Sequence, residues 1–224
     1  MISNYLLENG RIAIKHTRHG FMAFNRNDTV IGRSLDLYGE WCEDELRFLS
    51  GAIRYGDLVV DVGSNIGTHA LGFSQLVGNQ GTVIACEPQP QTFNILCANV
   101  AMNVADNVRC FNKAVSNIIG TISVPRLAPD APANFGGLGL RGNYSGPTDL
   151  IEMVAIDDLQ LPSCRLIKAD VQGMEPEVLR SAARTISSYR PYLYVECDQI
   201  DHGPELIGTI MAFGYDIWWH LTSH

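Results

Sequence analysis

The sequence lacks the features that define several common classes of protein. None of its six cysteines has a neighbour at CxxC spacing, and no apolar stretch is long enough to span a membrane. The first residues, MISNYLLENGR, have neither the charged start nor the long apolar run of a signal peptide. We therefore expect a cytoplasmic protein with no membrane insertion, whose cysteines are reduced and packed as small apolar side chains.

Positive charge is also scarce. The chain has 16 basic and 24 acidic residues, which gives a formal net charge of −8. A protein that binds duplex nucleic acid normally carries the opposite sign, so we expect no nucleic-acid partner. His16 and His19 could be read as a metal-binding pair, but they stand in an expected hairpin turn without acidic or thiol neighbours, and we predict no metal site there. The sequence does not indicate an oligomeric state.

The length of 224 residues suits one domain with a small appendage. Residues 1–36 are expected to form an N-terminal hairpin extension, because RIAIKH and FMAFNR surround a short polar turn. Residues 37–224 are expected to form the main domain. This part opens with a helix predicted over residues 39–53, where apolar side chains recur at near-helical spacing.

From Asp57 onward, short apolar runs alternate with helical patterns. The expected strands are LVVDV, TVIACEP, NVRCFNKAV, CRLIKAD, PYLYVECD and YDIWWH. The expected helices are IGTHALGFSQLVG, PQTFNILCANVAMN, MEPEVLRSAARTI and GPELIGTIMAFG. This alternation is typical of right-handed βαβ units, so we predict an α/β fold around a parallel sheet. Residues 125–149, rich in proline and glycine, interrupt it and are predicted to form a lid-like loop.

The stretch VVDVGSNIGTHA, residues 59–70, predicts a strand, a glycine turn and a helix. Ligands of open α/β sheets bind beyond the carboxyl ends of the strands, which is where this turn lies. A dinucleotide would need G-x-G-x-x-G, and the middle glycine is missing between Gly63 and Gly67. Asp61 would repel a pyrophosphate but suits the ammonium and sulfonium charges of S-adenosylmethionine. The turn therefore favours S-adenosylmethionine as the cofactor.

A second acid strengthens this interpretation. Glu87 ends the next strand, about twenty residues past Gly67, where a carboxylate can accept both ribose hydroxyls. The adenine is expected near the end of the third strand, and the face of Trp41 could cover a sulfonium or adenine, or pack in the core. The expected cofactor contacts are Glu40, Trp41, Asp61, Gly63, Asn65, Ile66, Gly67, Glu87, Pro88, Asn112, Lys113 and Ala114.

Several segments together carry a family resemblance. GDLVVDVGSNIGTHAL, VIACEPQPQTFNILCANV, VAIDDL, LIKADVQGMEPEVLRSA and YLYVECD are similar to the FkbM family of S-adenosylmethionine-dependent methyltransferases. The string K-x-D-x-Q-G-x-E at residues 168–175 is the most specific part, although Gln172 stands where the family often has Glu. The resemblance implies a Rossmann-like class I methyltransferase fold with a mostly parallel seven-stranded sheet. It also implies an O-methyltransferase acting on a hydroxyl of a small molecule or glycan, of the sugar, glycolipid or polyketide class.

The fourth and fifth strands carry the candidate catalytic residues. Lys168 and Asp170 alternate onto one face at the end of a strand, and Glu196 ends the next strand. Asp170 is the first candidate for general base; alternatively it holds a divalent metal ion or bonds the cofactor's ammonium. Lys168 could keep Asp170 ionised, stabilise an alkoxide, or form a purely structural ion pair with it.

Other functions fit the sequence less well. A nicotinamide-dependent oxidoreductase on a Rossmann sheet is disfavoured by the missing glycine and by Asp61. A non-catalytic adaptor that retains the methyltransferase fold would not need the intact cofactor residues. A methylase of nucleic-acid bases would need an aromatic clamp after the fourth strand, where the chain reads ADVQGM.

Overall fold

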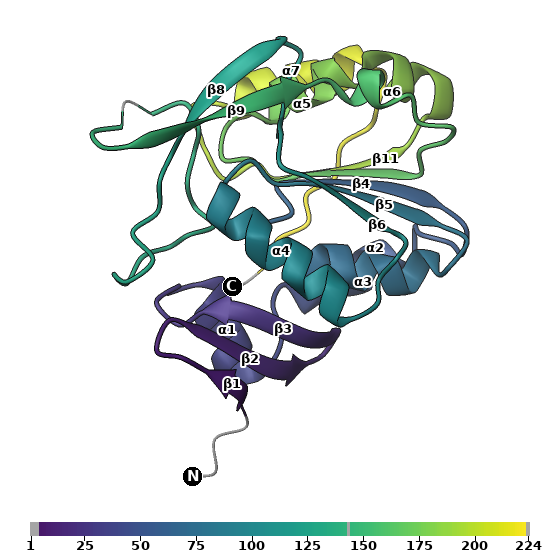
Figure 1. Cartoon of the computed structure of the whole chain (residues 1–224). Helices are drawn as coiled ribbons and strands as arrows, with labels where there is room; N and C mark the ends of the chain where they lie inside the picture. Colours follow the sequence, from purple (N-terminus) through teal and green to yellow (C-terminus); the bar gives the residue numbers. More distant parts are fainter. Residues whose placement is uncertain (1–4, 143, 223–224) are drawn as a thin grey trace.

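The computed structural model describes residues 5–142 and 144–222, and its centre is a parallel sheet (Figure 1). The strands are β4 (Leu58–Val62), β5 (Thr82–Cys86), β6 (Val108–Phe111), β10 (Leu166–Ala169) and β11 (Tyr192–Val195), in the order β11-β10-β4-β5-β6. All their pairings are parallel. The chain runs outward from β4 to β6 and then returns to β10 beside β4, so strand order reverses between β4 and β10. The α/β class predicted from the alternation is confirmed.

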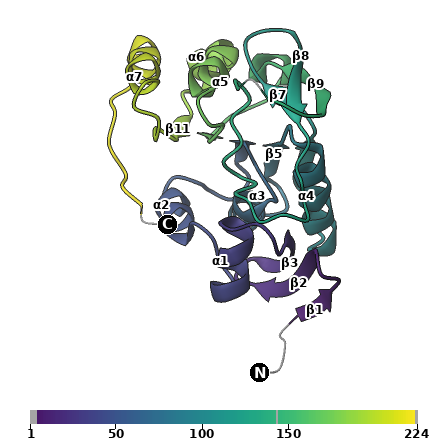
Figure 2. The ribbon, with the colours of Figure 1, turned by 90° about the vertical axis from the view of Figure 1, so that its left-hand side faces the viewer.

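The expected number of strands is wrong, because the described residues give this sheet five strands rather than seven. The predicted third strand divides: β6 ends at Phe111, and β7 (Ala114–Val115) joins another sheet. The predicted last strand, residues 215–220, is not a strand. It runs from the end of α7 (Gly203–Ala212) toward α2 (Glu43–Ser50) (Figure 2). The ring of His220 stacks on Phe48, and its Nδ1 lies 3.0 Å from the Tyr194 hydroxyl. Contacts with α2 thus replace pairing with β11.

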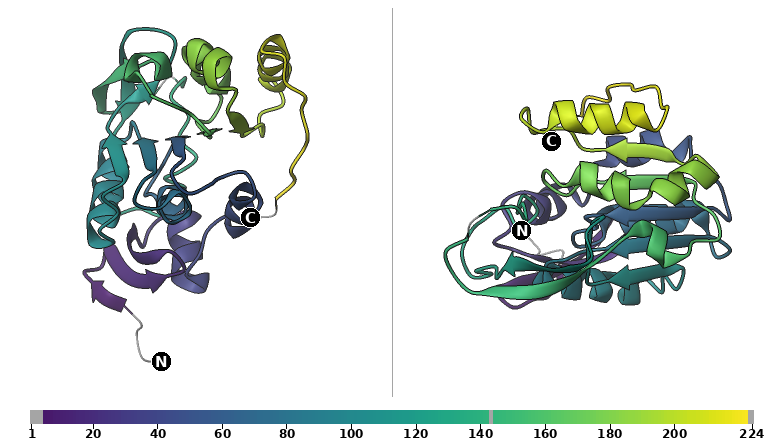
Figure 3. Two further views of the ribbon diagram at one scale, coloured as in Figure 1. Left: turned by 90° about the vertical axis from the view of Figure 1, so that its right-hand side faces the viewer. Right: turned by 90° about the horizontal axis from the view of Figure 1, so that it is seen from above.

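Helices cover both faces of the sheet, as the fold class requires (Figures 1 and 3). Helices α3 (Thr68–Val77) and α4 (Pro90–Met102) pack with α2 on one face. Helices α5 (Glu175–Ser181), α6 (Ala183–Tyr189) and α7 lie on the other. None of the helices in the described part of the chain is long and apolar enough to cross a membrane.

The single helix expected over residues 174–186 is wrong, because the chain breaks at Ala182 and forms α5 and α6. A side chain from another segment binds the backbone N–H groups at this break. Asp157, in the short 3₁₀ helix Ile156–Leu159, accepts hydrogen bonds from the backbone N–H groups of Arg184 and Thr185, each 2.8 Å long. A carboxylate at the second helix's N-terminus satisfies donors that a continuous helix would have paired internally.

The period-two alternation of the strands separates two apolar clusters. Val59 and Leu166 face the cluster under α2, α3 and α4, whereas Val60 and Ile167 face the cluster under α5, α6 and α7. Asp61 and Lys168 share the parity of Val59 and Leu166, so both polar side chains point to the α3 side. The register thus aims a carboxylate and an ammonium into the same buried layer.

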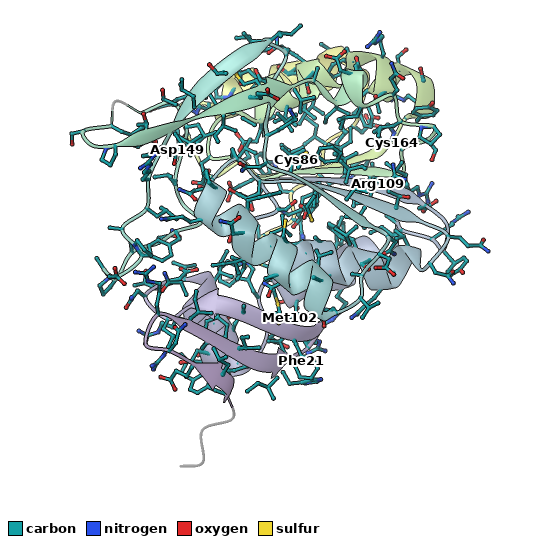
Figure 4. The ribbon with its side chains drawn as sticks, in the orientation of Figure 1. Phe21, Cys86, Met102, Arg109, Asp149 and Cys164 are labelled. Atoms are coloured by element: carbon teal, nitrogen blue, oxygen red, sulfur yellow. The ribbon has the colours of Figure 1, made fainter. Side chains whose placement is uncertain are left out.

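The N-terminal segment forms a small sheet of its own below α4 (Figure 1). The expected hairpin is present as β2 (Ile12–Thr17) and β3 (Gly20–Asn25), and β1 (Tyr5–Glu8) adds a strand that the sequence did not suggest. Helix α1 (Ile31–Tyr38) follows. Phe21 of β3 lies beside the end of α4, near Met102, and Asn103 bonds its backbone (Figure 4).

A further carboxamide joins this sheet to the glycine turn. The Asn99 side chain of α4 bonds both the N–H and the C=O of Ala23, at 2.7 and 3.0 Å, and donates to the Ile66 carbonyl at 2.8 Å. Asn99 is completely buried. Because each polar atom of its amide has a backbone partner, this group holds β3, α4 and the turn in one fixed arrangement.

The irregular segment expected at residues 125–149 lies between two paired strands. β8 (Gly120–Pro125) and β9 (Thr148–Val154) are antiparallel, and with β7 they form the third sheet. Between them the chain crosses to the N-terminal sheet, where Ala133 exchanges backbone hydrogen bonds with Asn27 and Thr29 at 3.0 and 2.9 Å. On its return, Arg141 forms an ion pair with Glu177 of α5.

Candidate active site

The glycine turn occupies the carboxyl end of β4. Gly63 and Gly67 have φ angles of +79° and +92°, a region that favours glycine. A Cβ added to Gly63 would lie 1.9 Å from the Asp170 carbonyl oxygen, so the backbones after β4 and β10 touch at this point. The Gly63 and Ser64 N–H groups both donate to the Cys86 carbonyl at 3.0 Å. The turn is thus tied to its neighbours on both sides.

Asp61 is a buried carboxylate with unused hydrogen-bonding capacity. Its side chain is 0% exposed, and neither carboxylate oxygen has a hydrogen-bond partner among the described residues. The nearest cation, the Lys168 ammonium, is 3.8 Å from Oδ1, beyond hydrogen-bond distance. An ionised carboxylate that lacks hydrogen bonds is costly to bury, so it marks a position where a cationic group of a ligand would be stabilised.

Lys168 lies between two carboxylates. Its ammonium is 3.3 Å from Asp170 Oδ2 and 3.8 Å from Asp61 Oδ1, and the side chain is 2% exposed. Burial alone would lower the pKa of Lys168, but the charges of Asp170 and Asp61 raise it. Lys168 therefore stays charged, and its charge lowers the pKa of Asp170.

Glu87 closes the other side of the turn. Its two carboxylate oxygens accept from the Asn65 N–H at 2.9 Å and the Gln89 N–H at 2.8 Å. Burial raises the pKa of Glu87 to about 7, although these two hydrogen bonds oppose the shift. The Asn112 amide donates to the Glu87 and Pro88 carbonyls at 2.9 and 3.0 Å. The expected contacts at residues 87, 88 and 112 therefore lie together.

Other expected cofactor contacts lie in different surroundings. The Glu40 carboxylate is 2.6 Å from the guanidinium of Arg18, in the turn between β2 and β3. Trp41 is partly buried against the cluster under α3. Lys113 pairs with Glu152 of β9, and Ala114 is buried in β7. The cofactor contacts of these four residues stay predictions.

Asp170 and Glu196 lie side by side just past the strand ends. Strands β10 and β11 pair in register up to Ala169 and Val195, and the Glu196 N–H donates to the Ala169 carbonyl at 2.9 Å. The negative charges of the two carboxyl groups oppose each other, which favours a proton on one of them. The Asp170 side chain is 39% exposed, so a second substrate can reach it, whereas it cannot reach Lys168.

The two carboxyl groups have opposite pKa shifts. Burial and the neighbouring Asp170 charge raise the pKa of Glu196 to about 9. Burial also acts to raise the pKa of Asp170, but Lys168 and the hydrogen bond from Glu196 lower it. At neutral pH the proton of the pair therefore belongs to Glu196, and Asp170 is the ionised partner.

Three side chains near this pair were not singled out as site residues by the sequence. Tyr194 stands beside Lys168 in the β10–β11 register, on the face that also holds Asp61. Glu45 of α2 lies 3.0 Å from the Nε2 of His69 on α3, and its charge acts on both Lys168 and Tyr194. Counting two residues back from Glu196 could have found Tyr194, but no sequence signal connects Glu45 with His69.

The segment after β8 passes over both halves of the site. A Cβ on Gly136 would lie 2.9 Å from the side-chain nitrogen Nδ2 of Asn65, and one on Gly139 would lie 3.1 Å from the backbone carbonyl oxygen of Gln172. Asn65 belongs to the glycine turn and Gln172 to the loop after β10. Residues 134–139 therefore cover the point where the two loops meet.

The carboxylates beside the glycine turn fit the cationic and hydroxyl groups of S-adenosylmethionine. Asp61 offers a carboxylate that accepts no hydrogen bond among the described residues, and Glu87 offers a second carboxylate across the glycine turn. Across residues 5–142 and 144–222 no group of three or more His, Cys, Asp or Glu side chains is arranged to bind a metal ion.

Comparison with known proteins agrees with this geometry. Residues 61–217 match the model of the methyltransferase FkbM domain. The hexuronic acid methyltransferase AglP of Haloferax volcanii is 31% identical over 162 residues, which cover 70% of this chain and 62% of AglP. The chain therefore spans less than two thirds of this relative.

Solved structures give the same result for the fold. An FkbM methyltransferase from Methylobacillus flagellatus is 25% identical, with a TM-score of 0.51 over 78% of this chain and 41% of its own. An S-adenosylmethionine-dependent O-methyltransferase from Thermotoga maritima, 11% identical, shares the fold with a TM-score of 0.50 over 89% of this chain and 61% of its own. With most of its length matched by the family model and the family's motifs gathered at the ends of β4, β5, β10 and β11, the chain belongs to the FkbM methyltransferase family.

Proposed function

We propose that this protein is an S-adenosylmethionine-dependent O-methyltransferase that acts on a hydroxyl of a small molecule or glycan. The observation that carries the proposal is Asp61, a fully buried carboxylate without a hydrogen-bond donor at the carboxyl end of β4. The relative AglP is named for hexuronic acid, which favours a sugar-containing acceptor, and within the sugar class we propose a hexuronic acid residue of a glycan. The cytoplasmic location expected from the sequence stays a prediction.

The cofactor would be held by residues of this chain on both sides of the glycine turn. Asp61 would face its cationic amino-acid end, and Glu87 would accept the ribose hydroxyls. Because Gly63 and Gly67 have no side chains, the cofactor could come close to the backbone between Asp61 and Glu87. When bound, the sulfonium supplies a methyl group whose C–S bond breaks as the acceptor oxygen bonds to carbon, and the electron pair stays on sulfur.

Asp170 would act as the general base. Its ionised carboxylate is exposed to an incoming hydroxyl and would take the hydroxyl proton as the new O–C bond forms. A positioned base typically contributes a factor of about 10²–10⁴ to the rate. Lys168 would keep Asp170 ionised without touching the acceptor, because its own ammonium is buried. Residues 134–139 would close over the acceptor as a lid.

The pKa of Glu87 leads to a testable pH dependence. Ribose hydroxyls donate to the ionised carboxylate, so S-adenosylmethionine should bind about tenfold more tightly at pH 8 than at pH 6, as the group with a pKa of about 7 loses its proton. Isothermal titration calorimetry at both pH values measures this. Glu87→Gln should bind weakly at both, and an equally steep dependence in this variant would contradict the assignment.

The ligand-free protein should respond to pH in the opposite direction. Because the folded-state pKa of Glu87 lies above its ordinary value of 4.5, folding favours the protonated form. The stabilisation is complete below pH 4.5 and is lost as the pH rises through about 7. Thermal unfolding without cofactor should therefore occur at a lower temperature at pH 8 than at pH 6, and this difference should shrink in Glu87→Gln.

Acceptor identity can be tested with S-adenosylmethionine carrying a tritiated methyl group. We expect label to enter hexuronic acid oligosaccharides as an ether, which survives mild alkali, rather than as a methyl ester, which does not. Neutral sugars, glycolipids and polyketides, each with magnesium or with a chelator, complete the panel. Cofactor binding without transfer to any hydroxyl compound would overturn the proposed acceptor class, whereas absent cofactor binding would overturn the donor assignment.

A further inference from the structure

Gln172 reaches both carboxyl groups of the pair described above. Its Nε2 lies 2.8 Å from Glu196 Oε2 and 3.5 Å from Asp170 Oδ1. A primary amide nitrogen carries two N–H groups and no titrating proton. One donated to Glu196 leaves the other Glu196 oxygen to hold the proton that the pair shares, and the second N–H points toward Asp170.

The backbone conformation of Gln172 fixes the position of this amide. Gln172 has a φ of +54°, a left-handed conformation that is unfavourable for a residue other than glycine. The turn is held by the Glu175 carboxylate, which accepts from the Val171 N–H at 3.0 Å and from the Gly173 N–H at 3.0 and 3.2 Å. The Glu175 carboxylate thus holds the turn that contains Gln172, and the Gln172 side chain points toward the end of β11.

Several titratable groups face the pair, and a role for Gln172 must be separable from theirs. They are Lys168 on β10, His69 on α3, Cys42 and Glu45 at the start of α2, Glu87 after β5, Glu175 on α5, and Cys197 and Asp198 after β11. All of these groups can gain or lose a proton, whereas the Gln172 amide cannot. Gln172 is the donor among them that stays neutral.

We propose that Gln172 is a positioning residue that ties Glu196 to Asp170, so that the two carboxyl groups keep a single proton and Asp170 remains the ionised base. This inference rests on the proposed methyl transfer for its kinetic consequence, but not for the shared proton itself. The residue acts through the pair and needs no contact with cofactor or acceptor. A glutamate in its place would remove the donor and add a third negative charge.

The test compares Gln172→Glu with Gln160→Glu. Gln160 is exposed, follows the 3₁₀ helix, and has a φ of +50°, so the control makes the same chemical change in the same backbone conformation away from the site. In Gln172→Glu we expect the acidic limb of the kcat profile to move up by at least one pH unit, with KM for the cofactor changed less than twofold. Gln160→Glu should match the wild type.

Infrared difference spectroscopy of the ligand-free protein provides a readout that does not need activity. At pH 8, where Glu87 with its pKa of about 7 is mostly ionised, the wild type should show the carbonyl band of a protonated carboxyl group that is lost in Glu196→Gln. Gln172→Glu should shift or broaden that band. If the band is absent from the wild type, or unchanged in Gln172→Glu, the inference is overturned whether or not the protein transfers methyl groups. A band that behaves as expected in an inactive protein would instead overturn only the proposed function.

Discussion

Replacing Asp61 with asparagine should weaken the binding of S-adenosylmethionine at least tenfold. The substitution keeps the shape of the side chain but removes the charge from a site where neither oxygen has a hydrogen-bond donor. A tenfold loss corresponds to about 1.4 kcal/mol, less than a desolvated charge pair can contribute. Calorimetry with purified protein measures the change. The fold should be retained, because Lys168 still has Asp170 at 3.3 Å.

Two comparisons make this result specific. Asp158→Asn changes an exposed carboxylate beside Arg184 and should leave cofactor binding unaltered. The second comparison uses 5′-methylthioadenosine, which lacks both the ammonium and the sulfonium charge. It should bind the wild type and Asp61→Asn with equal affinity. Equal loss for both ligands would mean that the substitution damages the pocket rather than removing a charge contact.

Replacing Gly63 with alanine should destabilise the protein by about 3 kcal/mol or more. The new methyl group would enter a left-handed residue and approach within 1.9 Å of the Asp170 carbonyl oxygen, which is backbone and cannot rotate away. Backbone strain and overpacking each cost about 1–3 kcal/mol. Urea denaturation followed by circular dichroism measures the free energy of unfolding.

Gly56→Ala separates the two causes. Gly56 has a φ of +86°, and a Cβ there would meet nothing within 4 Å. This variant should lose only about 1 kcal/mol, the cost of the left-handed conformation. If Gly63→Ala were no less stable than Gly56→Ala, the contact between the loops after β4 and β10 would not be the constraint described here.

The sequence predicted the elements whose pattern is local. The buried strand before Asp61, the glycine turn and the helix after it follow from apolar runs and glycines within a dozen residues, and the structure has them. The lateral neighbours of a strand are set by tertiary packing. The prediction of a last strand was wrong for this reason. His220 contacts Phe48 of α2 and Tyr194 of β11 through its side chain, and its segment does not pair with the edge of the sheet.

The site was predictable to a similar degree. The positions of Asp61, Glu87, Lys168 and Asp170 at strand ends follow from counting along single strands. The pairing of Asp170 with Glu196 depends on the β10–β11 register, and the path of residues 134–139 depends on contacts with the loop after β3. Neither can be read from one segment alone.

The buried amide of Asn99 has a consequence for how this protein can be shortened. Its polar atoms are shared between the strand that ends at Asn25 and the carbonyl of Ile66. Cutting away the first 26 residues would leave this amide in an apolar interior without two of its three hydrogen bonds, next to the glycine turn. We therefore expect that a shortened form has to keep the N-terminal sheet for the glycine turn to hold its conformation.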